Sequence, residues 1–179
     1  MDNGASSYRR YLDGDDAAFD EIMRLWFDRL ILFIDRYVHD LYTAEDIATD
    51  VFADLVVHRR RYNFQYALST YLFTLARNRA LNHLKRQKRL RFEPLDEQLA
   101  ERESLEDTVL KTERHRALHK AIADLPTDMQ AAVHLVYFEG LSYDEAGRVM
   151  NKNRKQIDNL LSRAKRELRT VLTEEGLTL

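Results

Sequence analysis

The chain has 179 residues, of which 45% are hydrophobic and 32% charged, and its formal net charge is −2. These proportions are typical of a folded, soluble protein and exclude wholesale disorder. The absence of cysteine excludes disulfides, thiolate catalysis and cysteine-based metal sites, and it is compatible with the cytoplasm. The longest strictly apolar run, at 30–34, is far too short to span a bilayer, and no signal peptide is recognisable. Only 5 Gly and 2 Pro are present, which suits helices joined by short turns, so we expect an all-α protein. From the absence of cysteine and the short apolar runs we expect a cytoplasmic protein without membrane insertion.

Charge is distributed in blocks along the chain. Residues 1–57 contain 5 basic and 13 acidic residues, residues 58–91 contain 10 basic and no acidic residues, and residues 92–113 contain 2 basic and 8 acidic residues. Such a block can be no more than a solvated face, but like charges at helical spacing repel one another. A block as uniform as 58–91 therefore favours an external partner of opposite charge.

Apolar residues recur at spacings of three and four from Phe19 to Tyr37, which predicts one long amphipathic helix or two in succession. A further helix is expected to open with Thr43 as its N-cap. Glu45 and Asp46 then fall in the first turn, where the helix dipole favours acids. The expected buried face of this helix consists of Ile47, Val51, Phe52 and Leu55.

Asp46, Asp50 and Asp54 are spaced four residues apart on another face of the same helix. Three acids in register repel one another and add nothing to the fold, which favours a basic protein partner. The alternative is that the dipole explains Asp46 and that the other two keep the helix soluble. Spacing alone leaves both interpretations open.

The basic segment combines cations with aromatic rings, namely Tyr62, Phe64, Tyr66, Tyr71 and Phe73. Rings can stack on unpaired bases while cations follow the backbone, as single-stranded nucleic acid requires. We expect a loop over 62–68 and a helix from about Ser69. Ordinary core packing is favoured for Phe73 and stays open for Tyr71. The candidate nucleic-acid-binding residues are Arg61, Tyr62, Phe64, Tyr71, Thr74, Arg77, Asn78, Asn82, Lys85 and Arg89.

Residues 92–113 contain a proline, many acids and few apolar residues, which predicts a flexible acidic linker with a helix at its end. The linker would separate two small helical domains, 1–91 and 114–179.

The C-terminal segment divides into three predicted helices. The first runs from about Pro126 to Gly140, and the second opens with a capping box from Ser142 to Glu145 and ends near Met150. In the tight turn that follows, Asn151 tolerates the left-handed conformation and Asn153 can cap the third helix, which starts at about Arg154.

A short helix, a tight turn and a longer helix with a basic, amide-bearing face are typical of a helix-turn-helix, which reads the major groove of DNA. A generic helical hairpin is the alternative. Amide and guanidinium groups can bond base edges, while lysines and arginines bond phosphates. The candidate duplex-binding residues are Arg154, Lys155, Gln156, Asn159, Ser162, Arg163 and Arg166.

Motifs for catalysis are missing from the sequence. His115 and His119 have a spacing that could ligate zinc, but no third ligand lies in a suggestive place, so we expect no metal site. There is no glycine-rich phosphate loop and no recognisable nucleophile–base pair. We expect no catalytic residue, no cofactor and no enzymatic activity.

In its order of parts the chain resembles bacterial RNA polymerase sigma factors of the extracytoplasmic-function (ECF) group, which have only regions 2 and 4. Residues 44–56 resemble region 2.2, residues 69–89 resemble regions 2.3 and 2.4, and residues 125–169 resemble region 4. The resemblance implies a region 2 domain at 1–91, a linker at 92–113 and a helix-turn-helix region 4 domain at 114–179.

The resemblance also implies partners and roles. Region 2.2 of the family docks on the β′ clamp helices of core RNA polymerase, region 4 contacts the β flap, and an anti-sigma factor commonly controls activity. The basic segment would melt and hold the −10 promoter element, with Asn78 contacting a base and the loop 62–68 capturing a flipped base. The third C-terminal helix would read the −35 element. The residues implied for polymerase binding are Glu45, Asp46, Asp50 and Asp54.

The sequence departs from the family pattern at several positions. Tyr71 replaces the usual tryptophan, the pair Ala146 and Gly147 stands where Ile-Ala is common, and Asn151 stands where glycine is usual. Residues 154–159 differ at the base-reading positions, so the −35 sequence cannot be transferred from relatives.

Two other functions compete with that of a promoter-directing initiation factor. A stand-alone helix-turn-helix regulator with a helical N-terminal domain leaves the aromatic and basic segment unexplained, because duplex binding does not need it. An RNA-binding protein leaves the helix-turn-helix unexplained. Binding to core polymerase distinguishes both from a sigma factor.

Overall fold

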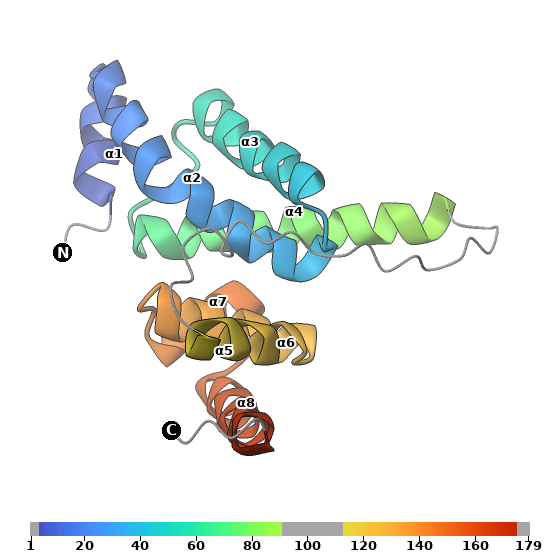
Figure 1. The fold of residues 1–179 in the computed structure, drawn as a ribbon. Helices are drawn as coiled ribbons and strands as arrows, with labels where there is room; N and C mark the ends of the chain where they lie inside the picture. Colours follow the sequence, from blue (N-terminus) through green and yellow to red (C-terminus); the bar gives the residue numbers. More distant parts are fainter. Residues whose placement is uncertain (1–3, 91–112, 175–179) are drawn as a thin grey trace.

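The computed structural model describes residues 4–90 and 113–174, and within these residues the chain is helical without a β-strand, as predicted. Figure 1 shows an N-terminal group of helices beside a C-terminal group. The elements are α1 (Ala5–Leu12), α2 (Asp16–Val38), α3 (Leu41–Val57), α4 (Leu68–Leu90), α5 (Glu113–Ala123), α6 (Thr127–Val133), the π-helix η2 (His134–Phe138), α7 (Tyr143–Met150) and α8 (Arg154–Glu174). The predicted linker lies outside the described residues, except for Glu113, which opens α5.

The N-terminal group is built around α2, which packs against α1, α3 and α4. The periodic apolar segment is therefore one helix rather than two, and its rings of Trp26 and Phe33 meet Phe73 of α4 edge to face at 6.1 and 5.1 Å. Phe73 is fully buried, as expected. Helix α1 was not predicted, and it is anchored by the buried rings of Tyr8 and Tyr11.

The start of α3 differs from the prediction. Asp40, not Thr43, is the N-cap: its carboxylate accepts a hydrogen bond from the backbone N–H of Thr43 at 3.0 Å. The chain reaches this position because His39 adopts a left-handed conformation with φ of 55°, which ends α2 and lets α3 begin at Leu41. The predicted buried face of α3 is confirmed.

The C-terminal group contains the predicted helix-turn-helix in α7 and α8. Ser142 and Glu145 form the capping box of α7, and Asn151 ends it with φ of 54°. The turn brings the carbonyl oxygen of Lys152 so close to Gly147 that a Cβ atom there would lie 2.5 Å from it. Glycine at position 147 therefore makes this tight turn possible.

Before α7 the chain forms a π-helix, in which the N–H of Glu139 bonds the carbonyl of His134 at 3.0 Å. Such wide turns are rare and often lie at functional positions. Gly140 follows with φ of 69° and ends this helical stretch where the sequence predicted it.

The two groups contact each other directly, through α4 with α7 and α2 with α6 (Figure 1). None of the helices in the described residues combines the length and apolar character that crossing a bilayer needs.

Candidate nucleic-acid and polymerase interfaces

The C-terminal half of α4 exposes a continuous row of polar side chains. Asn78, Asn82, Lys85 and Arg89 are all exposed and are spaced so that they share one face of the helix. We call these four residues the polar strip. Thr74 precedes them, but it is half-buried and its hydroxyl donates a 2.6 Å hydrogen bond to the carbonyl of Thr70. The strip therefore offers two amides and two cations, while the Thr74 hydroxyl proton is already engaged.

The aromatic loop, residues 62–68, joins α3 to α4. Tyr62 is only 4% exposed, and its hydroxyl donates a 2.6 Å hydrogen bond to the carbonyl of Tyr66. Its ring lies 4.7 Å from that of Phe64 and 5.2 Å from that of Tyr71. Burial raises the pKa of both Tyr62 and Tyr71. Tyr62 thus supports the loop from inside, while Phe64 and Tyr71 remain half-exposed.

The most exposed ring of the aromatic loop belongs to Tyr66, which is 46% exposed. Tyr66 was not among the candidate residues. Its position in an aromatic loop beside cations is the sequence signal that could have identified it. The guanidinium of Arg148, on α7, lies 4.0 Å from the centre of this ring. A residue of the C-terminal group therefore covers the ring.

Two candidate arginines are engaged within the fold. Arg77 is half-buried near Tyr37. Burial raises the pKa of Tyr37 to about 12, although the positive charge of Arg77 acts in the opposite direction. Arg61 is exposed but lies 3.4 Å from a carboxylate oxygen of Asp54.

The acidic face of α3 is divided. Glu45, Asp46 and Asp50 are exposed, whereas the Asp54 side chain is 12% exposed and lies 3.4 Å from Arg79 of α4. Asp50 also lies 3.5 Å from Arg79. The expectation that these acids add nothing to the fold is therefore wrong for Asp54 and Asp50, which both join α3 to α4. Spacing could not reveal this, because the partner is far along the sequence.

The recognition helix α8 exposes most of its candidate residues. Arg154 is 3.1 Å from Asp144 of α7. Gln156 takes part in a reciprocal cap, in which its side-chain oxygen accepts from the N–H of Asn153 and its own N–H donates to the Asn153 side chain, both at 2.9 Å. The candidates that remain exposed without such a contact are Lys155, Asn159, Ser162, Arg163 and Arg166.

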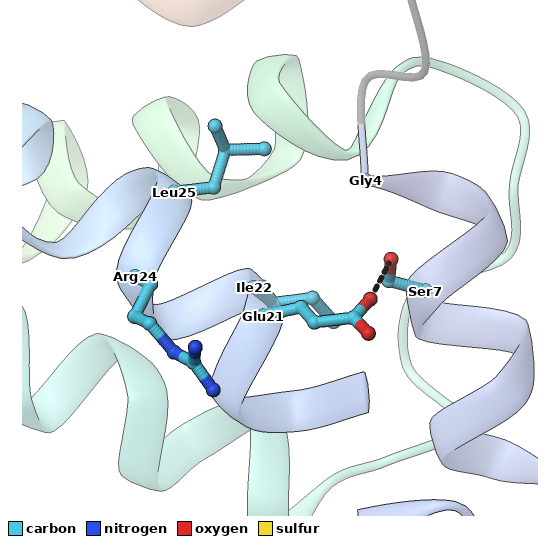
Figure 2. Close-up of a pocket in the computed structure, with 6 residues that line it drawn as sticks. All are labelled: Gly4, Ser7, Glu21, Ile22, Arg24 and Leu25. Atoms are coloured by element: carbon cyan, nitrogen blue, oxygen red, sulfur yellow. Dashed lines mark hydrogen bonds between the residues drawn. The ribbon is translucent and has the colours of Figure 1, made fainter. Parts of the chain in front are cut away.

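The described residues give little support for metal binding or catalysis. They contain no group of three or more His, Cys, Asp or Glu that could hold a metal. A hollow of about 410 Å³ lies between α1 and α2, and Ser7 in its lining donates a 2.9 Å hydrogen bond to Glu21. Figure 2 shows these two side chains pointing toward each other. Arg10 also pairs with Glu21 at 3.0 Å, so this contact ties two helices together and does not activate the serine.

Comparison with known proteins covers both helical groups. Residues 22–90 match the family described as Sigma-70 region 2, and residues 115–168 match Sigma-70, region 4. The RNA polymerase sigma-H factor of Pseudomonas aeruginosa is 33% identical over 150 residues, which cover 76% of this chain and 77% of that protein. The chain belongs to the sigma-70 family of RNA polymerase sigma factors.

Other relatives place this sigma factor in the ECF group. The ECF sigma factor BldN of Streptomyces coelicolor is 34% identical over 171 residues, 91% of this chain and 63% of that protein. SigW of Bacillus subtilis is 25% identical over 174 residues, 90% of this chain and 92% of that protein. As an ECF sigma factor, the protein is a transcription initiation factor that binds core RNA polymerase and directs it to promoters. The stand-alone regulator is not favoured.

Solved structures share the fold. RpoE from Bartonella quintana, solved with the anti-sigma factor NepR, superposes with a TM-score of 0.71 at 21% identity, covering 87% of this chain and 96% of that one. CnrH, solved with the cytosolic domain of CnrY, superposes with a TM-score of 0.63 at 16% identity, covering 96% of both chains.

Proposed function

We propose that this sigma factor reads its promoters through two separate surfaces: the polar strip and aromatic loop at the −10 element, and the exposed face of α8 at the −35 element. The observation that carries the proposal is the polar strip, a row of exposed amides and cations on a helix that contains no acidic residue. Domains at 1–91 and 114–179, joined by the acidic linker 92–113, belong to the same proposal.

At the −10 element the amides and the cations of the polar strip would have different roles. The amides of Asn78 and Asn82 can bond base edges, and Lys85 and Arg89 can neutralise phosphates. Unstacking a base costs a few kcal/mol. A stacking contact with a ring such as Tyr71 or Tyr66 returns about 1–3 kcal/mol per base.

At the −35 element the first turns of α8 would enter the major groove. Lys155 and Asn159 are exposed on this face and carry the cation and the amide that phosphate and base contacts need. Gln156 keeps both of its amide protons for a base, because only its oxygen serves the cap.

The exposed acids Glu45, Asp46 and Asp50 would dock on the β′ clamp helices, with Asp54 holding α3 in position against α4. Region 4 would contact the β flap. Two structural relatives were solved with partner proteins, NepR and CnrY, which supports an anti-sigma partner for this chain. We further propose that the protein acts in the cytoplasm and has no catalytic activity of its own.

Run-off transcription with purified core polymerase tests the proposal. Genomic fragments should yield defined transcripts only when both the core and this protein are present. Tight duplex binding by the protein alone, without transcription on addition of core, would contradict it.

A further inference from the structure

We propose that Arg9 of helix α1 is a positioning residue for promoter recognition: together with Tyr8, it holds Phe64 of the aromatic loop in a strained conformation that shapes the loop to receive a base. This inference rests on the proposed function, in which the aromatic loop acts at the −10 element. Helix α1 covers Ala5–Leu12 and precedes residues 22–90, which match Sigma-70 region 2, so its contribution is not part of that match.

The backbone of Phe64 has an unusual conformation. Its φ is 59°, in the left-handed region, which is uncommon for a residue with a bulky side chain and costs free energy. Among the described residues, His39 and Asn151 also combine a side chain with a positive φ, but each of them ends a helix, where a left-handed residue is a normal C-terminal cap. Phe64 lies between α3 and α4 and ends neither helix. A strained residue persists only where its surroundings hold it, and such residues cluster at functional sites.

Part of what holds Phe64 is local. The side-chain oxygen of Asn63 accepts a hydrogen bond from the backbone N–H of Gln65 at 3.1 Å, which closes a turn around Phe64. Asn63 and Gln65 are both exposed, so water competes for both partners and the net contribution of this bond is small. The strained conformation therefore also depends on contacts of the Phe64 side chain.

Helix α1 supplies such contacts from two consecutive residues. The guanidinium carbon of Arg9 lies 4.9 Å from the centre of the Phe64 ring, which is within the range of a cation–π contact. The Tyr8 ring lies 6.1 Å from that of Phe64 and meets Tyr62 edge to face at 5.3 Å. The Phe64 ring therefore contacts α1 as well as the buried Tyr62 ring of its own loop.

The same helix is also fixed to the segment that leads into the aromatic loop. Tyr8 is fully buried, and its hydroxyl donates a 2.8 Å hydrogen bond to the carbonyl of Arg59. The Arg59 guanidinium in turn lies 5.4 Å from the centre of the Tyr11 ring. Helix α1 thus holds the chain at position 59 and again at position 64. A loop that has its binding shape before DNA arrives binds at a lower entropic cost.

Arg9 and its neighbour Arg10 have different partners. Arg10 pairs with Asp15 at 2.6 Å and with Glu21 at 3.0 Å, which anchors α1 to α2. Within the part of the chain that the structure describes, Arg9 forms no ion pair, and its exposed side chain contacts the Phe64 ring. The first of the two arginines therefore serves the aromatic loop, while the second serves the packing of α1.

Open-complex formation by the holoenzyme tests the role of Arg9. On a promoter recovered by run-off transcription, Arg9→Ala should reduce open-complex formation about two- to tenfold, as expected for the loss of one cation–π contact. Arg9→Lys keeps a cation for the ring and should recover most of the wild-type level. The matched control, Arg24→Ala, removes an exposed arginine of α2 and should have no effect. Circular dichroism checks that each variant remains folded.

Salt dependence separates positioning from direct contact with DNA. The probe is a single-stranded oligonucleotide with the non-template sequence of the melted region, bound by holoenzyme. Each cation that neutralises a phosphate of a single strand makes the plot of log affinity against log salt concentration steeper by about 0.7. Arg9→Ala should weaken binding but keep the wild-type slope, because Arg9 acts on the Phe64 ring. A slope that is shallower by about 0.7 would assign Arg9 to a phosphate and overturn the positioning role.

Two substitutions at Phe64 test the strain. Phe64→Gly and Phe64→Ala both remove the ring, but only glycine adopts a positive φ without strain. In thermal unfolding, Phe64→Gly should therefore melt about 2–4 °C above Phe64→Ala, although glycine is the less stable choice at an ordinary position. Both variants should lose open-complex formation at least as strongly as Arg9→Ala, because the ring that Arg9 positions is gone.

Equal open-complex formation by wild type and Arg9→Ala would overturn the role of Arg9. A lower melting temperature for Phe64→Gly than for Phe64→Ala would show that the loop is not strained and would overturn that part of the proposal. Failure of the wild-type holoenzyme to open any promoter would instead overturn the proposed function, and the thermal comparison at Phe64 would still decide whether the loop is strained.

Discussion

The Asp54 carboxylate lies 3.4 Å from the Arg79 guanidinium, and this ion pair joins α3 to α4. The first helix carries the acids proposed for polymerase binding, and the second carries the polar strip. The surface that would hold polymerase is thus fixed to the surface that would hold DNA. Arg61 reaches the same carboxylate at 3.4 Å, so two arginines pair with Asp54.

We expect Asp54→Asn to destabilise the protein by about 1–3 kcal/mol, because it removes the more buried of the two carboxylates that pair with Arg79, the other being that of the exposed Asp50. Urea unfolding followed by circular dichroism measures this change. Asp46→Asn, at an exposed position on the same helix, is the control and should change stability by less than about 0.5 kcal/mol. Equal effects of the two substitutions would show that the pair does not stabilise region 2.

Charge reversal at Asp46 should weaken binding to core polymerase at least tenfold without unfolding the protein, because like charges placed at an interface cost several kcal/mol. Fluorescence anisotropy of the labelled chain, titrated with core enzyme, measures the affinity. The control is Asp20→Lys, an equal charge change at an exposed position of α2. If Asp20→Lys bound core polymerase as weakly as Asp46→Lys, the loss of affinity would be due to net charge rather than to the acidic face of α3.

Asn78→Ala should reduce open-complex formation by about five- to 150-fold, since losing a good base contact costs about 1–3 kcal/mol. Permanganate footprinting of a promoter recovered by run-off transcription measures the melted region. Gln87→Ala removes an exposed amide from the same helix outside the polar strip and should have little effect. Assembly with core polymerase should stay normal in both variants, because neither residue belongs to the acidic face of α3.

Gly147→Ala should destabilise region 4 by about 1–3 kcal/mol, because the new Cβ would lie 2.5 Å from the Lys152 carbonyl oxygen and the turn would have to open. Thermal unfolding and binding to duplex promoter DNA by holoenzyme should both weaken. Arg169→Ala, on the exposed side of α8, is the control for stability. Wild-type stability in Gly147→Ala would mean that the turn adapts at no cost.

Asp40→Ala should lower the stability of region 2 by about 0.5–2 kcal/mol through loss of the α3 N-cap. Hydrogen bonds from Thr43 lower the pKa of Asp40 in the folded protein. Its contribution is therefore present above the unfolded pKa of about 3.9 and disappears as the pH falls through the depressed folded value. Unfolding free energies of wild type and variant should converge in that acidic range, and a difference that is independent of pH would argue against the carboxylate as the cap.

The sequence predicted features that depend on neighbouring residues. The capping box at Ser142, the left-handed Asn151 and the cap at Asn153 are local, and each was found where expected. The four residues of the polar strip were all among the candidate residues, and helical spacing fixes that they share a face. The N-cap at Thr43 failed because two suitable residues lie three positions apart, and the path of the chain through His39 decides between them.

Features that depend on distant contacts were missed. Helix α1 is held by buried tyrosines, one of which, Tyr8, donates a 2.8 Å hydrogen bond to the carbonyl of Arg59. The pairing of Asp54 with Arg79 and the covering of Tyr66 by Arg148 likewise join residues far apart in the sequence. Periodicity carries no information about such partners.

The reciprocal cap between Asn153 and Gln156 constrains how this protein can acquire a new promoter preference. A substitution at Gln156 that suits a different base pair would also release the backbone N–H of Asn153 and fray the start of α8. Lys155 and Asn159 take no part in this cap. Divergence in −35 specificity among descendants of this chain should therefore accumulate at 155 and 159 before it reaches 156.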